Sequence, residues 1–269
     1  MNVDFSVPLP DFHLTDPATH EGIALQGVTK SFNGQKVLDS LDFTITRGET
    51  IVVIGRSGEG KSVLLKHIVR LLEPDHGRIW VDGVEVTTLR KTALFELRKR
   101  FGMLFQMAAL FDSLTICDNV GLSLVEHTDL SPDQIRQRAC DCLRLVGLVD
   151  VEDKLPSELS GGMRKRAGLA RAIVMQPDYI LYDEPTTGLD PITADAINDL
   201  ILKLQAELKV TSVVVTHDLA SAFKVADRIA MLNEGKIIYA DKVENVQRTE
   251  NPFVRQFLAG SAQGPLGAF

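Results

Sequence analysis

The stretch GRSGEGKS, from Gly55 to Ser62, is the feature that most constrains how this chain can fold. It fits the pattern G-x-x-x-x-G-K-S and stands directly between an apolar run, TIVVI, and a helical pattern, SVLLKHIVRLL. A strand that passes into a helix through glycines leaves backbone N–H groups that can surround phosphate oxygens. A flexible glycine-rich turn is the alternative, but the flanking strand and helix favour a phosphate-binding loop.

Each residue of this loop is a candidate contact with the phosphate chain of a nucleotide. Lys61 would bridge the outer phosphates, and the hydroxyl of Ser62 can ligate Mg²⁺. The predicted nucleotide contacts are Gly55, Arg56, Ser57, Gly58, Glu59, Gly60, Lys61, Ser62 and Val63.

A pair of acids ends a second apolar run, YILYDE. Asp183 and Glu184 would stand at the carboxyl end of a buried strand, where ligands bind in sheets of this kind. Asp183 would hold Mg²⁺ through water, and Glu184 would orient and deprotonate the water that attacks the γ-phosphate. Taken alone, the pair could be an acidic turn, but a phosphate loop in the same chain favours the metal and base roles.

The histidine that ends a third apolar run, SVVVTHD, is a further candidate. His217 could contact the γ-phosphate. A lone histidine at a strand end is usually a surface residue, so this prediction depends on the other motifs.

The apolar pattern predicts an α/β fold. The runs TIVVIG, YILYD and SVVVTHD are nearly continuous in apolar residues, as buried parallel strands are. Alternation from Leu41 to Ile45 and the pair Asp82-Gly83 indicate antiparallel strands with a hairpin. From about Thr92 to Gln176 the pattern is helical. We therefore expect a parallel α/β core, an antiparallel β subdomain and a helical subdomain over about 92–176.

The ends of the chain differ from this core. Residues 1–20 are polar and contain three prolines, which predicts a loose extension before a main domain at 21–245. Residues 246–269 read as a tail in which Phe253, Val254 and Phe257 fall on a short helix that ends at Gly260. The apolar face of that helix could cover the chain's own domain or a neighbouring protein, and the sequence leaves both open.

Composition excludes several classes of protein. The 269 residues are 45% hydrophobic and carry a net charge of −7, so the chain is globular and has no overall positive field for nucleic acid. No run approaches the roughly 18 apolar residues of a membrane span, and the N-terminus lacks a signal-peptide pattern. Three cysteines do not suggest a disulfide framework, which fits a reducing cytosol.

The segment LSGGMRKR contains a candidate anion site. Ser160, Gly161 and Gly162 precede an alanine-rich helix, so a capping hydroxyl and free backbone N–H groups would point outward. Alone, the segment could equally be an ordinary capped helix start.

The order of Lys61, Gln106, LSGGM, YILYDEP, TGLD and His217 resembles that of an ABC-transporter ATPase subunit, over about Gly22 to Asp241. The resemblance implies ATP as ligand with Mg²⁺, and Gln106 as a contact to both the metal and the γ-phosphate. Phe32 would stack on adenine. Two subunits would pack head to tail, so that Ser160, Gly161 and Gly162 face the γ-phosphate held by the partner. Met163 and Val63 depart from the family pattern, in place of a glutamine and a hydroxyl residue.

Three sequence segments resemble the ATPase subunit of Mla-type phospholipid transporters. They are FGMLFQMAALFDSLTICDNV, PSELSGGMRKRAGLARAI and NPFVRQFLAGSAQGP. This likeness implies a peripheral protein on the cytoplasmic face of the inner membrane, with a permease, an MCE-domain protein and a STAS-domain protein as partners. The segment MAALFDSL after Gln106 would contact the permease or form a buried helix. An importer of amino acids or other solutes, and a non-transport ABC ATPase acting on nucleic acid, are the alternatives. The basic clusters LRKR (97–100) and RKR (164–166) are expected to be solvated faces without a nucleic-acid role.

Overall fold

The computed structural model describes residues 21–266, so the predicted N-terminal extension lies outside the described residues. Two compact units are present. We call residues 90–210 the helical unit, and residues 21–89 together with 211–266 the sheet unit. Within residues 21–266, no helix combines the length and the apolar character needed to cross a membrane.

The sheet unit contains thirteen elements, which bring distant parts of the sequence together. In chain order they are β1 (Gly22–Phe32), β2 (Gln35–Thr46), β3 (Thr50–Ile54), α1 (Lys61–Ile68), β4 (His76–Val81), β5 (Val84–Glu85), the 3-10 helix η1 (Val86–Thr88), β8 (Thr211–Thr216), α7 (Leu219–Val225), β9 (Arg228–Asn233), β10 (Lys236–Lys242), α8 (Val243–Arg248) and α9 (Pro252–Ala259).

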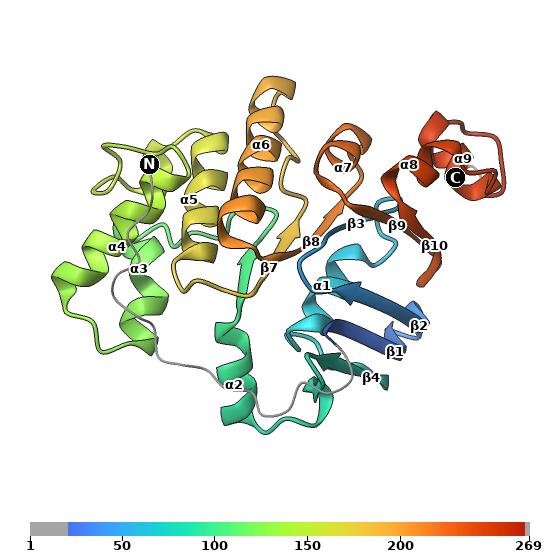
Figure 1. Ribbon diagram of the computed structural model, residues 1–269, viewed down its shortest axis with the longest axis horizontal. Helices are drawn as coiled ribbons and strands as arrows, with labels where there is room; N and C mark the ends of the chain where they lie inside the picture. Colours follow the sequence, from blue (N-terminus) through green and yellow to red (C-terminus); the bar gives the residue numbers. More distant parts are fainter. Residues whose placement is uncertain (1–20, 267–269) are drawn as a thin grey trace. The chain divides into compact units, whose positions relative to one another are not determined.

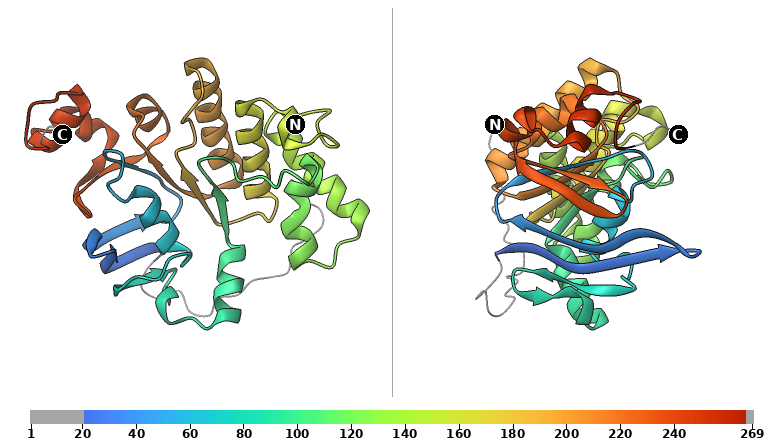
Figure 2. Two further views of the ribbon diagram at one scale, coloured as in Figure 1. Left: turned by 180° about the vertical axis from the view of Figure 1, so that it is seen from behind. Right: turned by 90° about the vertical axis from the view of Figure 1, so that its right-hand side faces the viewer.

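Antiparallel strands form one sheet of this unit, in the order β2-β1-β4-β5. Figure 1 shows its strands β2, β1 and β4. The paired strands β1 and β2 run side by side (Figure 2). Along β2, the buried residues Leu41, Phe43 and Ile45 alternate with exposed ones, as predicted. The hairpin between β4 and β5 is also confirmed, because Asp82 and Gly83 both have positive φ, as a type I′ turn requires.

The strands β10, β9, β3 and β8 are neighbours in that order in the same unit. β3 pairs in parallel with β8 and with β9, and every residue of β3 and β8 is buried. The prediction that TIVVI and SVVVT are buried parallel strands is therefore confirmed. The carboxyl end of β3 leads into the phosphate loop.

The helical unit contains the remaining elements. In chain order they are α2 (Lys91–Lys99), β6 (Phe101–Leu104), α3 (Ile116–His127), α4 (Pro132–Leu145), the 3-10 helix η2 (Pro156–Glu158), α5 (Gly161–Ile173), β7 (Tyr179–Asp183) and α6 (Pro191–Leu208). α5 packs against α3, α4 and β6.

Strand β6 was not foreseen, because the sequence pattern indicated only helix in this region. It pairs in parallel with β7, with Gly102 opposite Ile180. Four residues are too short for a period-2 pattern to emerge. Gly102 is required there, since a Cβ at this position would lie 2.2 Å from the carbonyl oxygen of Ala172 on α5. Tertiary packing against α5 thus defines this strand.

Helix starts in this unit follow the predicted capping rules. The side chain of Ser131 accepts from the N–H of Gln134 and the Gln134 side chain accepts in return, which completes a capping box at α4. Ser160 caps α5 by accepting from the N–H of Met163 at 3.3 Å.

Candidate nucleotide-binding and hydrolysis site

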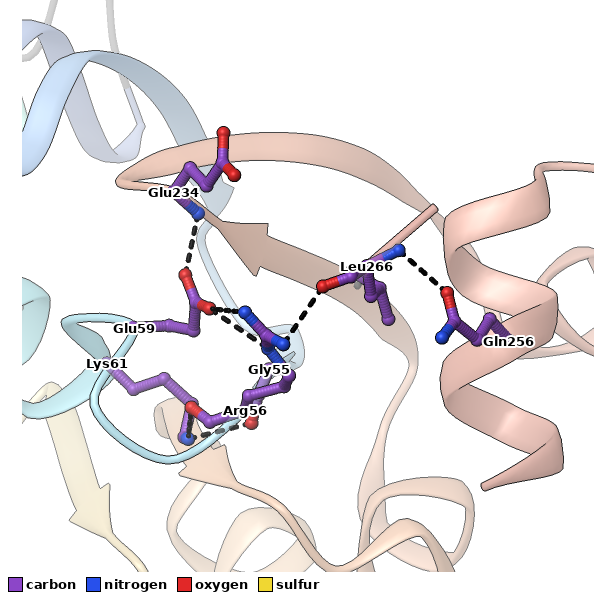
Figure 3. A network of polar contacts seen from close by, with 7 residues as sticks. All are labelled: Gly55, Arg56, Glu59, Lys61, Glu234, Gln256 and Leu266. Carbon is purple, nitrogen blue, oxygen red and sulfur yellow. Dashed lines mark hydrogen bonds and ion pairs between the residues drawn. The ribbon is translucent and has the colours of Figure 1, made fainter. Parts of the chain in front are cut away.

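The phosphate loop curls around the ammonium group of one buried lysine. Lys61, the first residue of α1, is 6% exposed and donates hydrogen bonds to the carbonyl oxygens of Gly55 at 2.8 Å and Arg56 at 2.9 Å (Figure 3). Gly60 has a φ of 97°, and a Cβ there would lie 2.9 Å from Cγ1 of Val37. Glycine is therefore needed to bring the loop into the start of α1, whose N-terminal dipole favours an anion.

An ion pair spans the outer side of this loop. The guanidinium of Arg56 donates to Oε1 of Glu59 at 3.2 Å, and Oε2 of Glu59 accepts from the N–H of Glu234 at 2.6 Å (Figure 3). Arg56 and Glu59, both predicted as nucleotide contacts, thus pair with each other here, and Glu59 ties the loop to the turn between β9 and β10.

The C-terminal tail reaches the same arginine. Nη1 of Arg56 donates to the carbonyl oxygen of Leu266 at 2.9 Å, and the N–H of Leu266 donates to Oε1 of Gln256 at 2.7 Å (Figure 3). Gln256 lies on α9 and is 7% exposed, and Val254 on the same helix is fully buried. In this structure the tail packs on its own chain.

Phe32 and His217 lie at strand ends of the sheet unit. Phe32 ends β1 and is 40% exposed, and the ammonium of Lys30 lies 5.6 Å from its ring centroid. His217 directly follows β8 and is exposed. Both side chains have the exposure that contact with a nucleotide would need.

The acidic pair lies at the end of β7 in the helical unit. Asp183 ends the strand and is 5% exposed, and Glu184 is 8% exposed. Glu184 has a φ of 50°, which is uncommon for a residue other than glycine and is typical of functional sites. Its Oε2 accepts from the hydroxyl of Thr187 at 2.9 Å.

Lys165 is the residue that sequence reasoning missed. It is 6% exposed, and its ammonium donates to the carbonyl oxygen of Glu184 at 3.0 Å and to that of Gln106. Burial lowers the pKa of Lys165, while the nearby charges of Asp183 and Glu184 oppose part of this shift. The expectation that the cluster RKR is a solvated face is therefore wrong for its central residue.

Helix α5 supports the Gln106 turn at two more positions. Arg171 donates to the carbonyl oxygens of Ala108 at 2.7 Å and Ala109 at 2.6 Å. A Cβ at Gly168 would lie 2.9 Å from Cδ1 of Leu104, so the helix approaches the end of β6 closely. Because Lys165, Gly168 and Arg171 are three residues apart, they share one face of α5. That spacing in GMRKRAGLAR was the available sequence signal.

Asn119 organises the segment that follows this turn. It is fully buried on α3, and its Oδ1 accepts from the N–H of Phe111 at 2.7 Å. Its Nδ2 donates to the carbonyl oxygens of Phe111, Leu114 and Thr115. One carboxamide thus holds the chain between Gln106 and α3 in an irregular path.

The anion site predicted in the segment LSGGM lies at the start of α5. Ser160 and Gly161 are exposed, whereas Gly162 is buried. A Cβ at Gly162 would lie 2.6 Å from Cγ2 of Thr193 on α6, so the two helices meet there closely. The exposed first residues of α5 remain available to an anion from outside the chain.

The predicted metal ligands have the right chemistry for Mg²⁺. Ser62, Gln106 and Asp183 offer a hydroxyl, a carboxamide and a carboxylate oxygen, and Mg²⁺ prefers oxygen. Among residues 21–266, no cluster of three or more His, Cys, Asp or Glu side chains could hold a metal by itself. Mg²⁺ is usually bound by few protein groups together with water and substrate phosphates.

A glycine-rich loop between a parallel strand and a helix, together with an acidic pair at the end of another strand, defines an α/β nucleotide-binding cassette of the P-loop class. A family model described as ABC transporter matches residues 38–187. The chain belongs to the ABC transporter family, and the predicted fold class is confirmed.

Relatives agree with this assignment. The probable ribonucleotide transport ATP-binding protein mkl of Mycobacterium tuberculosis is 42% identical over 245 residues, which cover 91% of this chain and 68% of that protein. The intermembrane phospholipid transport system ATP-binding protein MlaF of Escherichia coli is 39% identical over 244 residues, 91% of each chain. A solved ATP-binding cassette, MJ0796, dimeric in a post-hydrolysis state with ADP and Pi, has a TM-score of 0.77 at 33% identity and covers 82% of this chain and 98% of its own.

Proposed function

We propose that this chain is the ATP-binding and ATP-hydrolysing subunit of an ABC transporter that powers phospholipid transport. The observation that carries the ATPase function is the phosphate loop, which leads from β3 into the start of α1 and whose Gly55 and Arg56 carbonyl oxygens bind the ammonium of Lys61. The lipid cargo is supported by the likeness to MlaF along 91% of both chains.

In the proposed reaction, the loop holds the β- and γ-phosphates, and Lys61 stabilises their negative charge. The carboxylate of Glu184 accepts a proton from water, whose oxygen forms a bond to the γ-phosphorus. The bond between that phosphorus and the bridging oxygen breaks, and ADP and phosphate leave. Mg²⁺, held by Ser62, Gln106 and Asp183, would neutralise charge on the phosphates. His217 would contact the γ-phosphate and Phe32 the adenine.

Two copies of the chain would share each nucleotide. The exposed start of α5 offers a capping hydroxyl and N–H groups to an anion outside the chain, and the similar cassette MJ0796 is dimeric. We place Ser160, Gly161 and Gly162 of one copy against the γ-phosphate bound by the other copy.

A permease helix is the proposed occupant of a groove in the helical unit. The groove has a volume of about 610 Å³ and is lined mostly by apolar side chains. The segment 107–114 contributes Phe111, which is 54% exposed, and the neighbouring Met107 is 85% exposed. This exposure favours the contact surface over the buried helix. Such a permease would place the chain on the cytoplasmic face of the inner membrane, with MCE-domain and STAS-domain proteins as further subunits.

The cargo has a second candidate, because the relative mkl is named for ribonucleotide transport. The test is to purify the chain with its native permease, reconstitute the complex in vesicles and measure ATP hydrolysis. Phospholipid transport predicts a copurifying MCE-domain protein and phospholipid-dependent hydrolysis. A periplasmic solute receptor and stimulation by a ribonucleotide or amino acid would reject the lipid cargo, and copurifying nucleic acid would reject transport.

A further inference from the structure

We propose that Lys165 is a positioning residue for ATP hydrolysis, which holds the backbone of Gln106 and of Glu184 in the geometry that the reaction needs. This proposal rests on the proposed function, since it assigns Lys165 to the same reaction. Its ammonium joins two carbonyl oxygens that lie 59 and 19 residues away along the chain.

The backbone of Glu184 needs a partner of this kind. A positive φ at a glutamate is unfavourable by about 1 kcal/mol or more and persists only where the surroundings enforce it. Lys165 donates to the carbonyl oxygen of Glu184 itself, and the N–H of Thr187 donates to the same oxygen at 3.3 Å. A charged donor makes the stronger of such hydrogen bonds. The direction in which the Glu184 side chain leaves the main chain is therefore set in part by Lys165.

The Gln106 turn needs a partner for a different reason. Ala108 and Ala109 also have positive φ, and the side chains of Gln106 and Met107 are exposed, so those two side chains do not anchor the turn in the core. Lys165 and Arg171 supply donors from α5 to three successive parts of it, the carbonyl oxygens of Gln106, Ala108 and Ala109. One side chain thus connects the turn that carries Gln106 to the strand end that carries the acidic pair.

Burying the charged ammonium of Lys165 lowers the stability of the fold unless other interactions compensate. Burial of an ammonium is unfavourable, and a methionine of similar length would fill the same space without that cost. The compensating interactions are the two carbonyl oxygens and the negative charges of Asp183 and Glu184. The residue is therefore placed where it serves the geometry of the acidic pair.

The first test is Lys165→Met in the purified chain, with Lys203→Met as the matched control. Lys203 also donates to a backbone oxygen, that of Leu145 at 3.1 Å, but it lies on the exposed face of α6. We expect Lys165→Met to lower kcat at least about tenfold, with ATP affinity within about twofold of the parent, and Lys203→Met to change neither. An unchanged kcat, or a joint loss of kcat, affinity and melting temperature, would overturn the proposal.

The second test separates a positioning role from damage to helix α5, which also carries Ser160. Each proposed nucleotide site combines the phosphate loop of one chain with Ser160 of the other. Ser160→Arg in one chain therefore blocks the site at the partner's phosphate loop, and a mixed dimer with one such chain has a single working site. In one mixed dimer, Lys165→Met is placed in the chain that supplies the working Glu184, together with Ser160→Arg. In the other, Lys165→Met is placed in the chain that supplies only the working Ser160, and the partner carries Ser160→Arg.

We expect the first mixed dimer to hydrolyse ATP at least about tenfold more slowly than the second. Equal rates in the two would show that the lesion acts through α5 as a whole and would reject positioning of Glu184. The dimer that carries only Ser160→Arg in one chain is the reference. If it is inactive while the parent is active, either the sites are not shared or both must be intact for hydrolysis, and the homodimer experiment still decides the role of Lys165.

Discussion

The phosphate loop is held by one buried lysine, Lys61, and the backbone at the acidic pair by another, Lys165, and each ammonium bonds to two backbone oxygens. Lys61 and Lys165 are both 6% exposed. The oxygens bound by Lys61 belong to Gly55 and Arg56, six and five residues before it. Those bound by Lys165 come from Gln106 and Glu184, which are 59 and 19 residues away.

The difference between the two sites is one of contact order. Lys61 closes a local loop that its own glycines already shape, so its role follows from a short motif. Lys165 joins a turn, a helix and a strand end, so its role exists only once those elements have packed. We therefore expect changes at the first site to alter nucleotide binding and changes at the second to alter hydrolysis.

The largest effect should follow from Glu184→Gln, which tests the hydrolytic site directly. Loss of a general base typically lowers the rate about 10²- to 10⁴-fold, while the phosphate loop still binds ATP. A steady-state ATPase assay and ATP binding measured by filter retention check this. Hydrolysis at the parental rate would show that Glu184 is not the base.

Lys61→Ala should have the next largest effect, on binding. The lost hydrogen bonds from a charged group to phosphate contribute about 1.5 to 3 kcal/mol, which is a loss of affinity of roughly ten- to a hundredfold. Titration calorimetry with ATP measures it. Unchanged affinity would contradict the phosphate-loop assignment, and an equal loss in Lys165→Met would remove the distinction between the two lysines.

Gly168→Ala tests how closely α5 packs against the turn that carries Gln106. The added Cβ would lie 2.9 Å from Cδ1 of Leu104 and 3.2 Å from Cβ of Ala108. Overpacking of this kind costs about 1 to 3 kcal/mol of unfolding free energy, unless the turn shifts away. Denaturant unfolding measures the cost, and Gly161→Ala, where the nearest atom is 3.7 Å away, is the control. Equal stability of the two variants would show that α5 does not constrain the turn.

The smallest effects should come from the tail, whose Leu266 oxygen accepts a hydrogen bond from Arg56 of the phosphate loop. Deletion of residues 261–269 removes the Leu266 oxygen, but the ion pair between Arg56 and Glu59 at 3.2 Å still holds the loop. ATP affinity should therefore fall by no more than about tenfold.

Deletion after Gln247 should instead lower the melting temperature of the isolated chain, because it exposes the surface that Val254 covers. An isolated chain that keeps its stability after the longer deletion would favour a tail that serves a partner.

Sequence alone determined the features that depend on local contacts. The motif GRSGEGKS predicts a strand, a glycine turn and a helix start because backbone N–H groups and positive φ values are local properties. The Asp82-Gly83 hairpin, the Ser131 capping box and the Ser160 cap are confirmed for the same reason. The buried strands TIVVI and SVVVT were readable because continuous apolar runs reflect burial on both faces.

Tertiary structure decided what depends on packing between distant segments. Strand β6 is defined by its pairing with β7 and by the close approach of α5, and its four residues carry no pattern of their own. A basic cluster is usually solvated, so RKR favoured a solvated face, and the three-residue spacing to Gly168 and Arg171 could not show which oxygens Lys165 would meet. The path of the tail to Arg56 likewise joins residues 210 positions apart. Sequence patterns report the contacts of neighbouring residues, and these three contacts arise only when the chain has folded.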